Sequence, residues 1–326
     1  MEEIRVQSWT ELIERLHDRS WQPVIARHRS TFVFRGSANH QCALTPSLMR
    51  LGGDFASLEE HLLRTFRRYG LRYHAPDGSQ WNWLALAQHH GLPTRLLDWT
   101  YSPFVALHFA TADLAQFDRD SFVWCLDYVG AAALLPQRLC DVLEEEGAQV
   151  FTTEMLDAVA PSLQSFDALQ DEPFMLFFEP PALNDRIVNQ HGLFSITSGA
   201  GVRPDTWVAQ HPTLARRIVI PASLKWEVRD KLDQANITER VLFPGLDGLS
   251  RWLKRYYSPR ADVDRANDDT HHDVDEAKRA GEDAESATPR AAGEAAHRGN
   301  GTSRAASGGR AARRSAARAG RPARGR

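Results

Sequence analysis

The sequence contains few cysteines and no long hydrophobic run. Its three cysteines, Cys42, Cys125 and Cys140, are an odd number without CxxC spacing or matching histidine pairs. This argues against a disulfide framework or a structural zinc site and indicates a reducing compartment. No stretch approaches the roughly 18 apolar residues that span a membrane, and the N-terminus has no apolar signal region. We therefore expect a soluble, cytoplasmic protein with no membrane partner.

Several motifs that would identify an enzyme are also missing. The sequence has no GxSxG nucleophile elbow, no Walker loop and no dinucleotide-binding glycine fingerprint. His89, His90 and His108 lack the HExxH spacing of a zinc protease, so we predict no metal site. These absences assign no reaction and leave the function to be argued from the polar residues that are present.

Aromatic residues are absent after Pro259, where the composition changes. Residues 260–326 consist mainly of Asp, Glu, Ala, Arg, Gly and Ser, which cannot bury enough apolar surface to offset the entropy of folding. We expect a disordered tail that is acidic at first and arginine-rich over 304–326. The arginines would bind nucleic acid weakly and without specificity, and a biased tail with no fixed partner is the simpler interpretation.

Residues 1–259 are rich enough in Trp, Phe, Leu and Val to form one globular domain. Strand-like composition occurs at 31–34, 122–126 and 216–220, and residues 186–196 indicate a strand, a turn and a second strand. Helical spacing of apolar residues occurs in segments 8–18, 57–69, 80–90, 223–235 and 245–257. Without a regular βαβ rhythm, this predicts an α+β fold: a single mixed domain with a central, mostly antiparallel sheet flanked by helices.

Arg35 and Gly36 end the first predicted strand. A guanidinium there suits a carboxylate or phosphate held by two hydrogen bonds, and the glycine lets a ligand or another backbone approach closely. The structural alternative is a buried ion pair that joins Arg35 or Arg95 to Asp98.

Gln88, His89 and His90 end the predicted helix over 80–90, with Gly91 as its cap. A neutral imidazole there would serve as an acid, a base or a hydrogen-bond donor. The structural alternative is that one of the two histidines faces the core.

Thr100 and Ser102 precede a helix that starts at Pro103, so their hydroxyls and nearby N–H groups offer an anion site. Plain N-capping explains Ser102 equally well. Gln190 places an amide beside the turn at Gly192, where it would bind a polar ligand or simply lie at the surface. The candidate ligand-binding residues are Arg35, Gly36, Gln88, His89, Arg95, Asp98, Thr100, Ser102 and Gln190; His89 and Gln190 are also the catalytic candidates.

Several segments together resemble the FRG domain, which is named after its Phe-Arg-Gly motif. They are Phe34-Arg35-Gly36, Pro46-Ser47-Leu48, the run from Trp83 to Thr100 with Gln88-His89-His90-Gly91, and Ser102-Pro103 with Ala106-Leu107. The resemblance covers about residues 30–130, with a later element at 186–194. It implies a domain that occurs in bacteria and phages and has no characterised activity.

The order of Arg35, Thr100 and Gln190 is similar to that of the ADP-ribosyltransferase fold. In that fold an Arg and a Ser or Thr hold NAD, and a Glu supports the positive charge that develops on the sugar. The similarity implies NAD as a cofactor and a transferase or related hydrolase. Gln190 departs from it because an amide supplies no carboxylate, and Glu179 is the nearest glutamate. A binding site without catalysis fits equally well.

The hypothesis we favour is a polar pocket for a nucleotide-like or phosphorylated small molecule. A second hypothesis is a non-catalytic protein-interaction module anchored by Trp252, Tyr256 and Tyr257, although these residues would also suit the core face of the last helix. A third is weak nucleic-acid binding through the arginine-rich tail. The sequence identifies no protein partner.

Overall fold

The computed structural model describes residues 1–39, 43–73, 78–182 and 184–259. The predicted disordered tail at 260–326 and Cys42 lie outside these residues. Residues 1–258 form one compact unit, and the description below concerns that unit alone.

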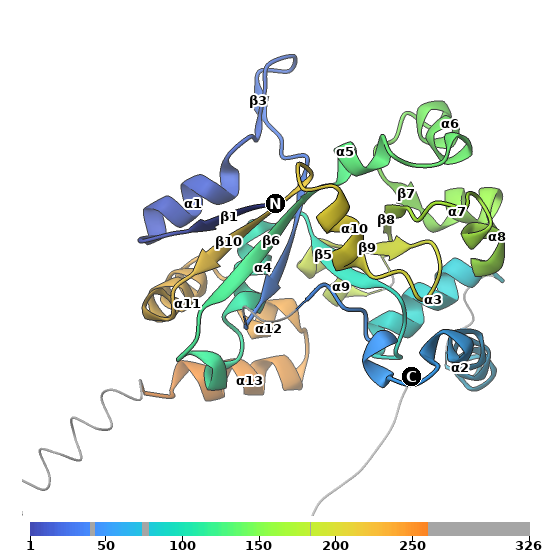
Figure 1. Cartoon of the computed structure of the whole chain (residues 1–326). Coiled ribbons are helices and arrows are strands. Elements are labelled where there is room, and N and C mark those ends of the chain that lie inside the picture. The colour runs from blue at the N-terminus through green and yellow to red at the C-terminus, as the bar shows by residue number, and fades with distance from the viewer. Residues whose placement is uncertain (40–42, 74–77, 183, 260–326) are drawn as a thin grey trace, which may run out of the picture. The chain divides into compact units, whose positions relative to one another are not determined.

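An eight-stranded sheet runs through this unit in the order β1-β10-β6-β4-β5-β9-β8-β7 (Figure 1). Neighbouring strands pair antiparallel except at the two edges, where β1 with β10 and β7 with β8 are parallel. In sheet order the strands are β1 (Glu2–Arg5), β10 (Ala215–Ile220), β6 (Ser121–Asp127), β4 (Phe32–Ser37), β5 (Leu97–Thr100), β9 (Gly192–Thr197), β8 (Met175–Glu179) and β7 (Phe151–Thr152). The mostly antiparallel α+β prediction is therefore confirmed.

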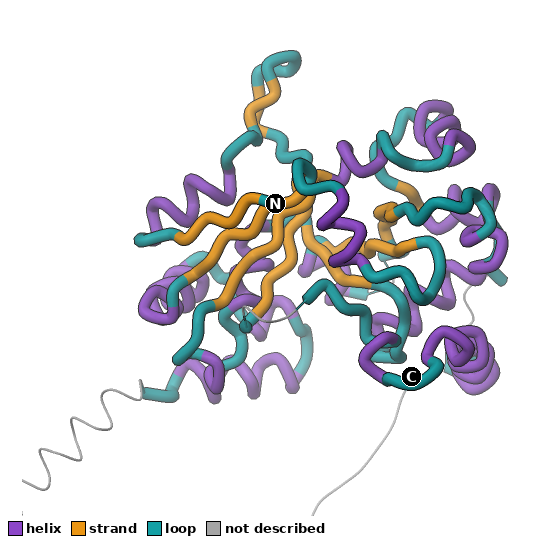
Figure 2. Tube along the Cα trace, in the orientation of Figure 1, coloured by secondary structure: helices purple, strands orange, loops and turns teal. Residues whose placement is uncertain are grey.

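Helices cover both halves of the sheet (Figure 2). On the half made of β10, β6 and β4, one face packs against α1 (Trp9–His17), α4 (Pro103–Ala110) and α11 (Lys225–Gln234). The other face of these strands shares a core with α10 (Pro204–Gln210). The half with β8 and β9 packs against α2 (Phe55–Gly70), α3 (Gln80–His89), α6 (Gln137–Glu145), α7 (Thr153–Val159) and α8 (Leu163–Asp167). The remaining helices are α5 (Tyr128–Ala132), α9 (Asp185–Gln190), α12 (Glu239–Leu242) and α13 (Leu246–Tyr256), with 3-10 turns at η1 (Met49–Leu51), η2 (Leu114–Gln116) and η3 (Ala222–Leu224).

The α3 helix differs from the amphipathic helix that was predicted. Its residues from Trp81 to Ala87 are all buried, because α2 lies on one side of it and α7 on another. Neither histidine at its end faces the core: His89 is half-buried and His90 is exposed. Since the helix ends at the surface, its polar C-terminal residues point away from the packed region.

The prediction of two strands over 186–196 is wrong in its first half. Residues Asp185–Gln190 form α9, and the strand β9 starts only at Gly192. The Asn184 side chain accepts a hydrogen bond from the Ile187 N–H and caps the helix, which ends at His191 with φ of +49°. The β-branched Ile187 and Val188 favoured a strand locally, but the cap and the surrounding packing select a helix.

Gly36 fixes how α4 lies against the sheet. A Cβ atom at Gly36 would lie 1.9 Å from the Ala106 carbonyl oxygen and 2.5 Å from the Ala110 nitrogen. Only a glycine lets the backbones of β4 and α4 approach this closely. The close approach that the sequence suggested at Gly36 is thus made by another backbone.

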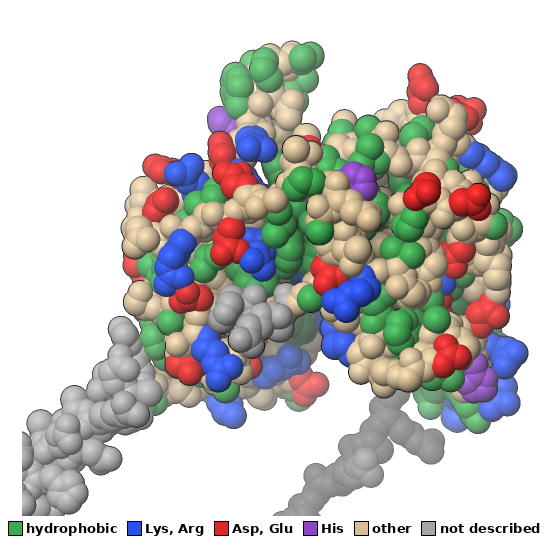
Figure 3. Space-filling model, in the orientation of Figure 1, with side chains coloured by type: hydrophobic (Ala, Val, Ile, Leu, Met, Phe, Trp, Pro, Cys, Tyr) green, Lys and Arg blue, Asp and Glu red, His purple; other side chains and the backbone are tan. Residues whose placement is uncertain are grey.

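A small hairpin, β2 (Trp21–Gln22) with β3 (Arg27–His28), extends away from the sheet with hydrophobic side chains at its tip (Figure 3). Trp21, Val24 and Ile25 are all exposed there. None of the described helices is long and apolar enough to cross a membrane.

Candidate functional site

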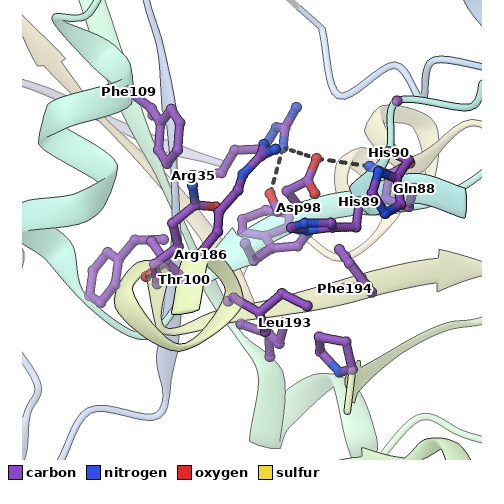
Figure 4. A pocket seen from close by; sticks show the side chains of 18 residues that line it. Arg35, Gln88, His89, His90, Asp98, Thr100, Phe109, Arg186, Leu193 and Phe194 are labelled. Carbon is purple, nitrogen blue, oxygen red and sulfur yellow. Dashed lines mark hydrogen bonds and ion pairs between the residues drawn. The ribbon is translucent and has the colours of Figure 1, made fainter. Parts of the chain in front are cut away.

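A cavity of about 610 Å³ opens where β4, β5 and β9 meet the end of α3 and the helix α9 (Figure 4). Its charged and polar lining residues are Arg35, Arg186, Asp98, Gln88, His89, His90, Thr100 and Gln190. Its apolar lining residues are Phe34, Trp99, Phe109, Pro180, Ile187, Leu193 and Phe194, with Gly36, Gly91 and Gly192 between them. The cavity therefore combines charged groups with aromatic walls.

Strand register explains why residues far apart in the chain meet here. Asp98 lies opposite Phe194, and Thr100 lies opposite Gly192, in the antiparallel pairing of β5 with β9. Asp98 and Thr100 are two residues apart, so their side chains share one face of the sheet with those partners. The cavity lies on that face.

Arg35 occupies a gap between β4 and β5. The ladder between these strands consists of one residue pair, Phe34 with Thr100, whereas β4 pairs with β6 over six residues. Arg35 Nη1 donates a hydrogen bond to the Asp98 carbonyl oxygen, which lies beyond that single pair. The same nitrogen is 3.9 Å from the Asp98 carboxylate, so the Arg35–Asp98 pair expected as an alternative does form. This pair lies at the cavity and is not sealed in the core, because 27% of the Arg35 side chain and 63% of the Asp98 side chain are exposed.

Gln88 and Thr94 orient the Asp98 carboxylate. Gln88 Nε2 donates to Asp98 Oδ2 at 2.9 Å, and Thr94 Oγ1 donates to Gln88 Oε1 at 2.6 Å. Because Thr94 occupies the acceptor side of the Gln88 amide, its donor side must face Asp98. Of the two, sequence reasoning selected Gln88 and missed Thr94.

His89 is held as a neutral imidazole. Its Nε2 lies 2.9 Å from Asn184 Nδ2, while Asn184 Oδ1 caps α9, so the asparagine must present an N–H to the ring. The ring nitrogen therefore accepts, and the proton lies on Nδ1. Burial lowers the pKa of His89, and the charges of Arg186 and then His90 lower it further, against a smaller opposing effect of Asp98. Near neutral pH this histidine is therefore a hydrogen-bond donor through Nδ1.

Arg186 is the main cavity residue that sequence reasoning missed. Its guanidinium lies over the Phe243 ring, 5.0 Å from the centroid, and Arg251 lies over the same ring at 4.7 Å. Burial lowers the pKa of Arg186, an effect that Asp98 opposes in part. Its Nε is buried and has no hydrogen-bond partner within the described chain. With Asn184 recognised as an N-cap, Arg186 and Gln190 would have been placed four residues apart on one helix face.

Thr100 and Gln190 line the cavity, but their polar groups also join β5 to α9. Thr100 Oγ1 donates to the Gln190 carbonyl oxygen at 2.7 Å and accepts from the Ser102 N–H at 3.0 Å. The Gln190 amide donates to the Leu242 carbonyl oxygen at 2.9 Å. Both residues therefore hold the cavity wall together, which limits what they offer to a ligand.

Two predicted ligand-binding residues lie away from the cavity. Ser102 caps α4 by accepting from the Val105 N–H at 3.3 Å, as the structural alternative required. Arg95 is buried and pairs with Glu59 and Asp167, not with Asp98 as the sequence suggested. Burial alone would lower the pKa of Arg95, but Glu59 and then Asp167 raise it above its usual value. Arg95 thus serves the fold.

The remaining predictions concern metals and the last helix. No group of three or more His, Cys, Asp or Glu residues in the described ranges could hold a metal ion. Tyr256, the last residue of α13, and Tyr257 after it are exposed, and Trp252 is half-buried, so these aromatics do not form the core face of that helix.

Comparison with known families supports the resemblance suggested by Phe34-Arg35-Gly36, three residues that line this cavity. A model of the FRG domain matches residues 30–119, which is shorter than the 30–130 expected from the motifs. No curated protein and no solved structure matches the chain. The match contains Arg35, Gln88, His89, Asp98 and Thr100, whereas Arg186 and Gln190 lie beyond it. The chain is therefore an FRG domain-containing protein, with the domain at residues 30–119.

Proposed function

We propose that the cavity binds a nucleotide-like or phosphorylated small molecule. The observation that carries this proposal is the pair of arginines from separate elements, Arg35 on β4 and Arg186 on α9, that line one cavity. Arginine binds phosphate and carboxylate groups in a planar, two-bonded geometry and keeps its charge under all ordinary conditions.

The charge balance of the lining supports an anionic ligand. Two arginines face one carboxylate, Asp98, among the described lining residues, and His89 is neutral. An anion at the cavity end of the Arg186 guanidinium would offset the effect of burial on its pKa.

The apolar lining supports a ligand that also carries a flat ring. The side chains of Phe109 and Phe194 belong to the lining of the same cavity as the arginines. Its volume of about 610 Å³ is within the range of small-molecule sites. Aromatic walls beside a cationic end suit a heterocyclic base joined to phosphate.

Calorimetric titration tests the proposal. The purified protein is titrated with NAD, ADP-ribose and ADP, each up to millimolar concentration. We expect saturable binding, weakened about 10-fold or more by Arg35→Ala and by Arg186→Ala, because each removes a charge-assisted hydrogen bond.

Arg138→Ala is the matched control for this titration. Arg138 is an exposed arginine on α6 that does not line the cavity, so its removal should leave the affinity unchanged. Circular dichroism melts would show that each variant is folded. Absence of binding by the wild-type protein to all three compounds at millimolar concentration would remove the proposal.

Transferase or hydrolase chemistry on NAD is a second, narrower proposal. Arg35, Thr100 and Gln190 line one cavity, in the order that suggested the ADP-ribosyltransferase similarity. Glu179 does not line it and instead accepts from the Tyr101 hydroxyl at 2.9 Å. A carboxylate that supports a developing charge on the sugar would therefore have to be Asp98. Nicotinamide release from NAD, lost in Asp98→Asn, is the expected result; no release by the wild-type protein contradicts the chemistry but not the binding.

A non-catalytic interaction module remains the alternative function. It is favoured by Tyr256 and Tyr257, which are 54% and 75% exposed, beside the exposed Leu253 on α13. Tyr256→Ser with Tyr257→Ser should then abolish co-purification of a specific partner, while Arg35→Ala should not. The same partners recovered with both variants would contradict this alternative. Nucleic-acid binding by residues 260–326 is tested by the salt dependence of DNA affinity before and after truncation at residue 300.

A further inference from the structure

We infer that Asp98 recognises a ribose, accepting hydrogen bonds from its 2′- and 3′-hydroxyls, so that the cavity selects ribonucleotides. The inference deepens the proposed function and rests on it. An anion site alone does not explain why the Asp98 carboxylate lies in this cavity.

A carboxylate opposes phosphate binding in the same cavity. The Asp98 side chain is 63% exposed and lies 3.9 Å from Arg35, so an anion placed on Arg35 would also approach Asp98. An ionised carboxylate only accepts hydrogen bonds, so a ligand that contacts it must bring donors. Among the parts of a phosphorylated small molecule, sugar hydroxyls are such donors, and carboxylates bind ribose hydroxyls in other nucleotide sites.

The orientation of the carboxylate is determined by a chain of hydrogen bonds. Thr94 Oγ1 accepts from the Leu96 N–H at 3.1 Å, which leaves its own proton for Gln88 Oε1. The Gln88 amide then donates to Asp98 Oδ2. Within the described chain Oδ1 accepts no hydrogen bond, so one carboxylate oxygen is anchored while the other remains available. An anchored acceptor of this kind is pre-organised for a ligand.

Asp98 also lies beside the space that a ribose would fill between a bound phosphate and a bound base. Arg35 lies on one side of it, and Phe194 lies opposite it across the β5–β9 pairing. Gly192, next along that face, carries no side chain to fill the space beside Thr100. A phosphate on the arginines and a base against the aromatic wall would leave the sugar next to Asp98.

The experiment compares three probes on two proteins. ADP, 2′,3′-dideoxy-ADP and inorganic pyrophosphate are titrated into wild-type protein and Asp98→Asn. For the wild type we expect ADP to bind about 10-fold or more tightly than its dideoxy counterpart, which lacks both hydroxyl donors.

In Asp98→Asn the affinity for ADP should fall, while the affinities for the other two probes should stay the same or rise. ADP should lose about 10-fold in affinity, because a charged acceptor is lost. Dideoxy-ADP and pyrophosphate should bind equally well or better, because a negative charge near the phosphate is removed. A purely structural role for Asp98 would shift all three probes in the same direction, and that result would overturn the inference.

Two variants complete the design. Gln88→Met removes the donor that positions Asp98 and should reduce the ratio of ADP to dideoxy-ADP affinity without abolishing pyrophosphate binding. Glu154→Gln, at an exposed carboxylate on α7 outside the cavity, should change neither ratio nor affinity.

The inference and the proposed function fail in different ways. Equal affinity of the wild type for ADP and dideoxy-ADP overturns the ribose assignment and leaves the anion site standing. No binding of ADP, while NAD or ADP-ribose binds, also overturns this assignment. No binding of any of the nucleotides or of pyrophosphate overturns both.

Discussion

Arg35 and Arg95 both lie in segments that match the FRG domain, yet their surroundings differ in almost every respect. The Arg95 side chain is 4% exposed and makes hydrogen bonds to Glu59, which is equally buried, and to Asp167. The Arg35 side chain is 27% exposed, and its guanidinium lies 3.9 Å from the carboxylate of the largely exposed Asp98. One guanidinium is enclosed by matched carboxylates, and the other borders a cavity.

The difference shows how to separate a structural arginine from a functional one. A buried arginine with two carboxylates has its charge neutralised, so nothing remains for a ligand. Arg35 donates to a backbone carbonyl, lies 3.9 Å from a largely exposed carboxylate and lines a cavity, where an anion can approach it. Position in a motif does not distinguish the two; the local carboxylate balance does.

The largest effect should come from removing the enclosed arginine. Arg95→Ala leaves Glu59 buried without its partner, so we expect the free energy of unfolding to fall by about 3–5 kcal/mol. Arg35→Ala should cost only about 1–2 kcal/mol, since it loses a hydrogen bond near solvent. Urea denaturation followed by circular dichroism measures both values.

A double variant sharpens this test. Arg95→Met with Glu59→Gln removes both buried charges and should recover a large part of the lost stability. Equal losses for Arg95→Ala and Arg35→Ala would contradict the contrast between the two environments.

The next largest loss of stability should come from substituting Gly36, the residue after Arg35. Gly36→Ala forces a Cβ atom to within 1.9 Å of the α4 backbone, so β4 and α4 must separate. We expect a loss of about 3 kcal/mol, at the upper end for overpacking. Gly91→Ala is the control: it meets open space, and with its φ of +80° it should cost about 1 kcal/mol. If Gly36→Ala proved as mild as Gly91→Ala, the close packing of α4 on β4 would be incorrect.

The pH dependence of stability should also differ between two histidines, the buried His108 and the cavity residue His89. Burial, followed by the charge of Arg229, lowers the pKa of His108 to about 3. The unfolded chain binds this proton below a pH of about 6.5, whereas the folded chain stays neutral until about pH 3, so stability falls as the pH drops through that window. From this group alone we expect a loss of about 2 kcal/mol between pH 7 and pH 5.

Denaturation at pH 7, 6 and 5 measures that dependence. His108→Gln should flatten it, even if the variant is less stable at pH 7, because the titrating group is gone. His89→Gln should flatten it much less, because the half-buried cavity histidine is shifted in the same direction with more access to water. The opposite ranking would show that the cavity is the more enclosed of the two environments.

The smallest effect on stability should come from Asp98→Asn. The side chain is largely exposed, and asparagine can still accept from Gln88, so we expect a change within about 0.5 kcal/mol. Thermal denaturation without ligand measures it. A loss comparable with that of Arg95→Ala would mean that Asp98 is a structural partner of Arg35 and not a cavity group.

Much of the fold could be predicted because its elements have local signals. The strand at β6, the cap and proline that start α4, and the glycine after α3 all follow from residues that are close in sequence. The helix α9 could not be predicted in this way, since its β-branched residues favour a strand and its cap at Asn184 was overlooked. That error also hid Arg186.

The amino-acid pattern alone established an α+β domain with conspicuous polar residues around positions 35, 88–102 and 190. Only the packed structure decided which of these residues face a cavity. Glu59 lies 36 residues before Arg95 and Asp167 lies 72 after it, whereas Asp98 is just three residues away. Pairing between distant charges depends on how the helices pack on the sheet, and no local sequence pattern encodes that arrangement.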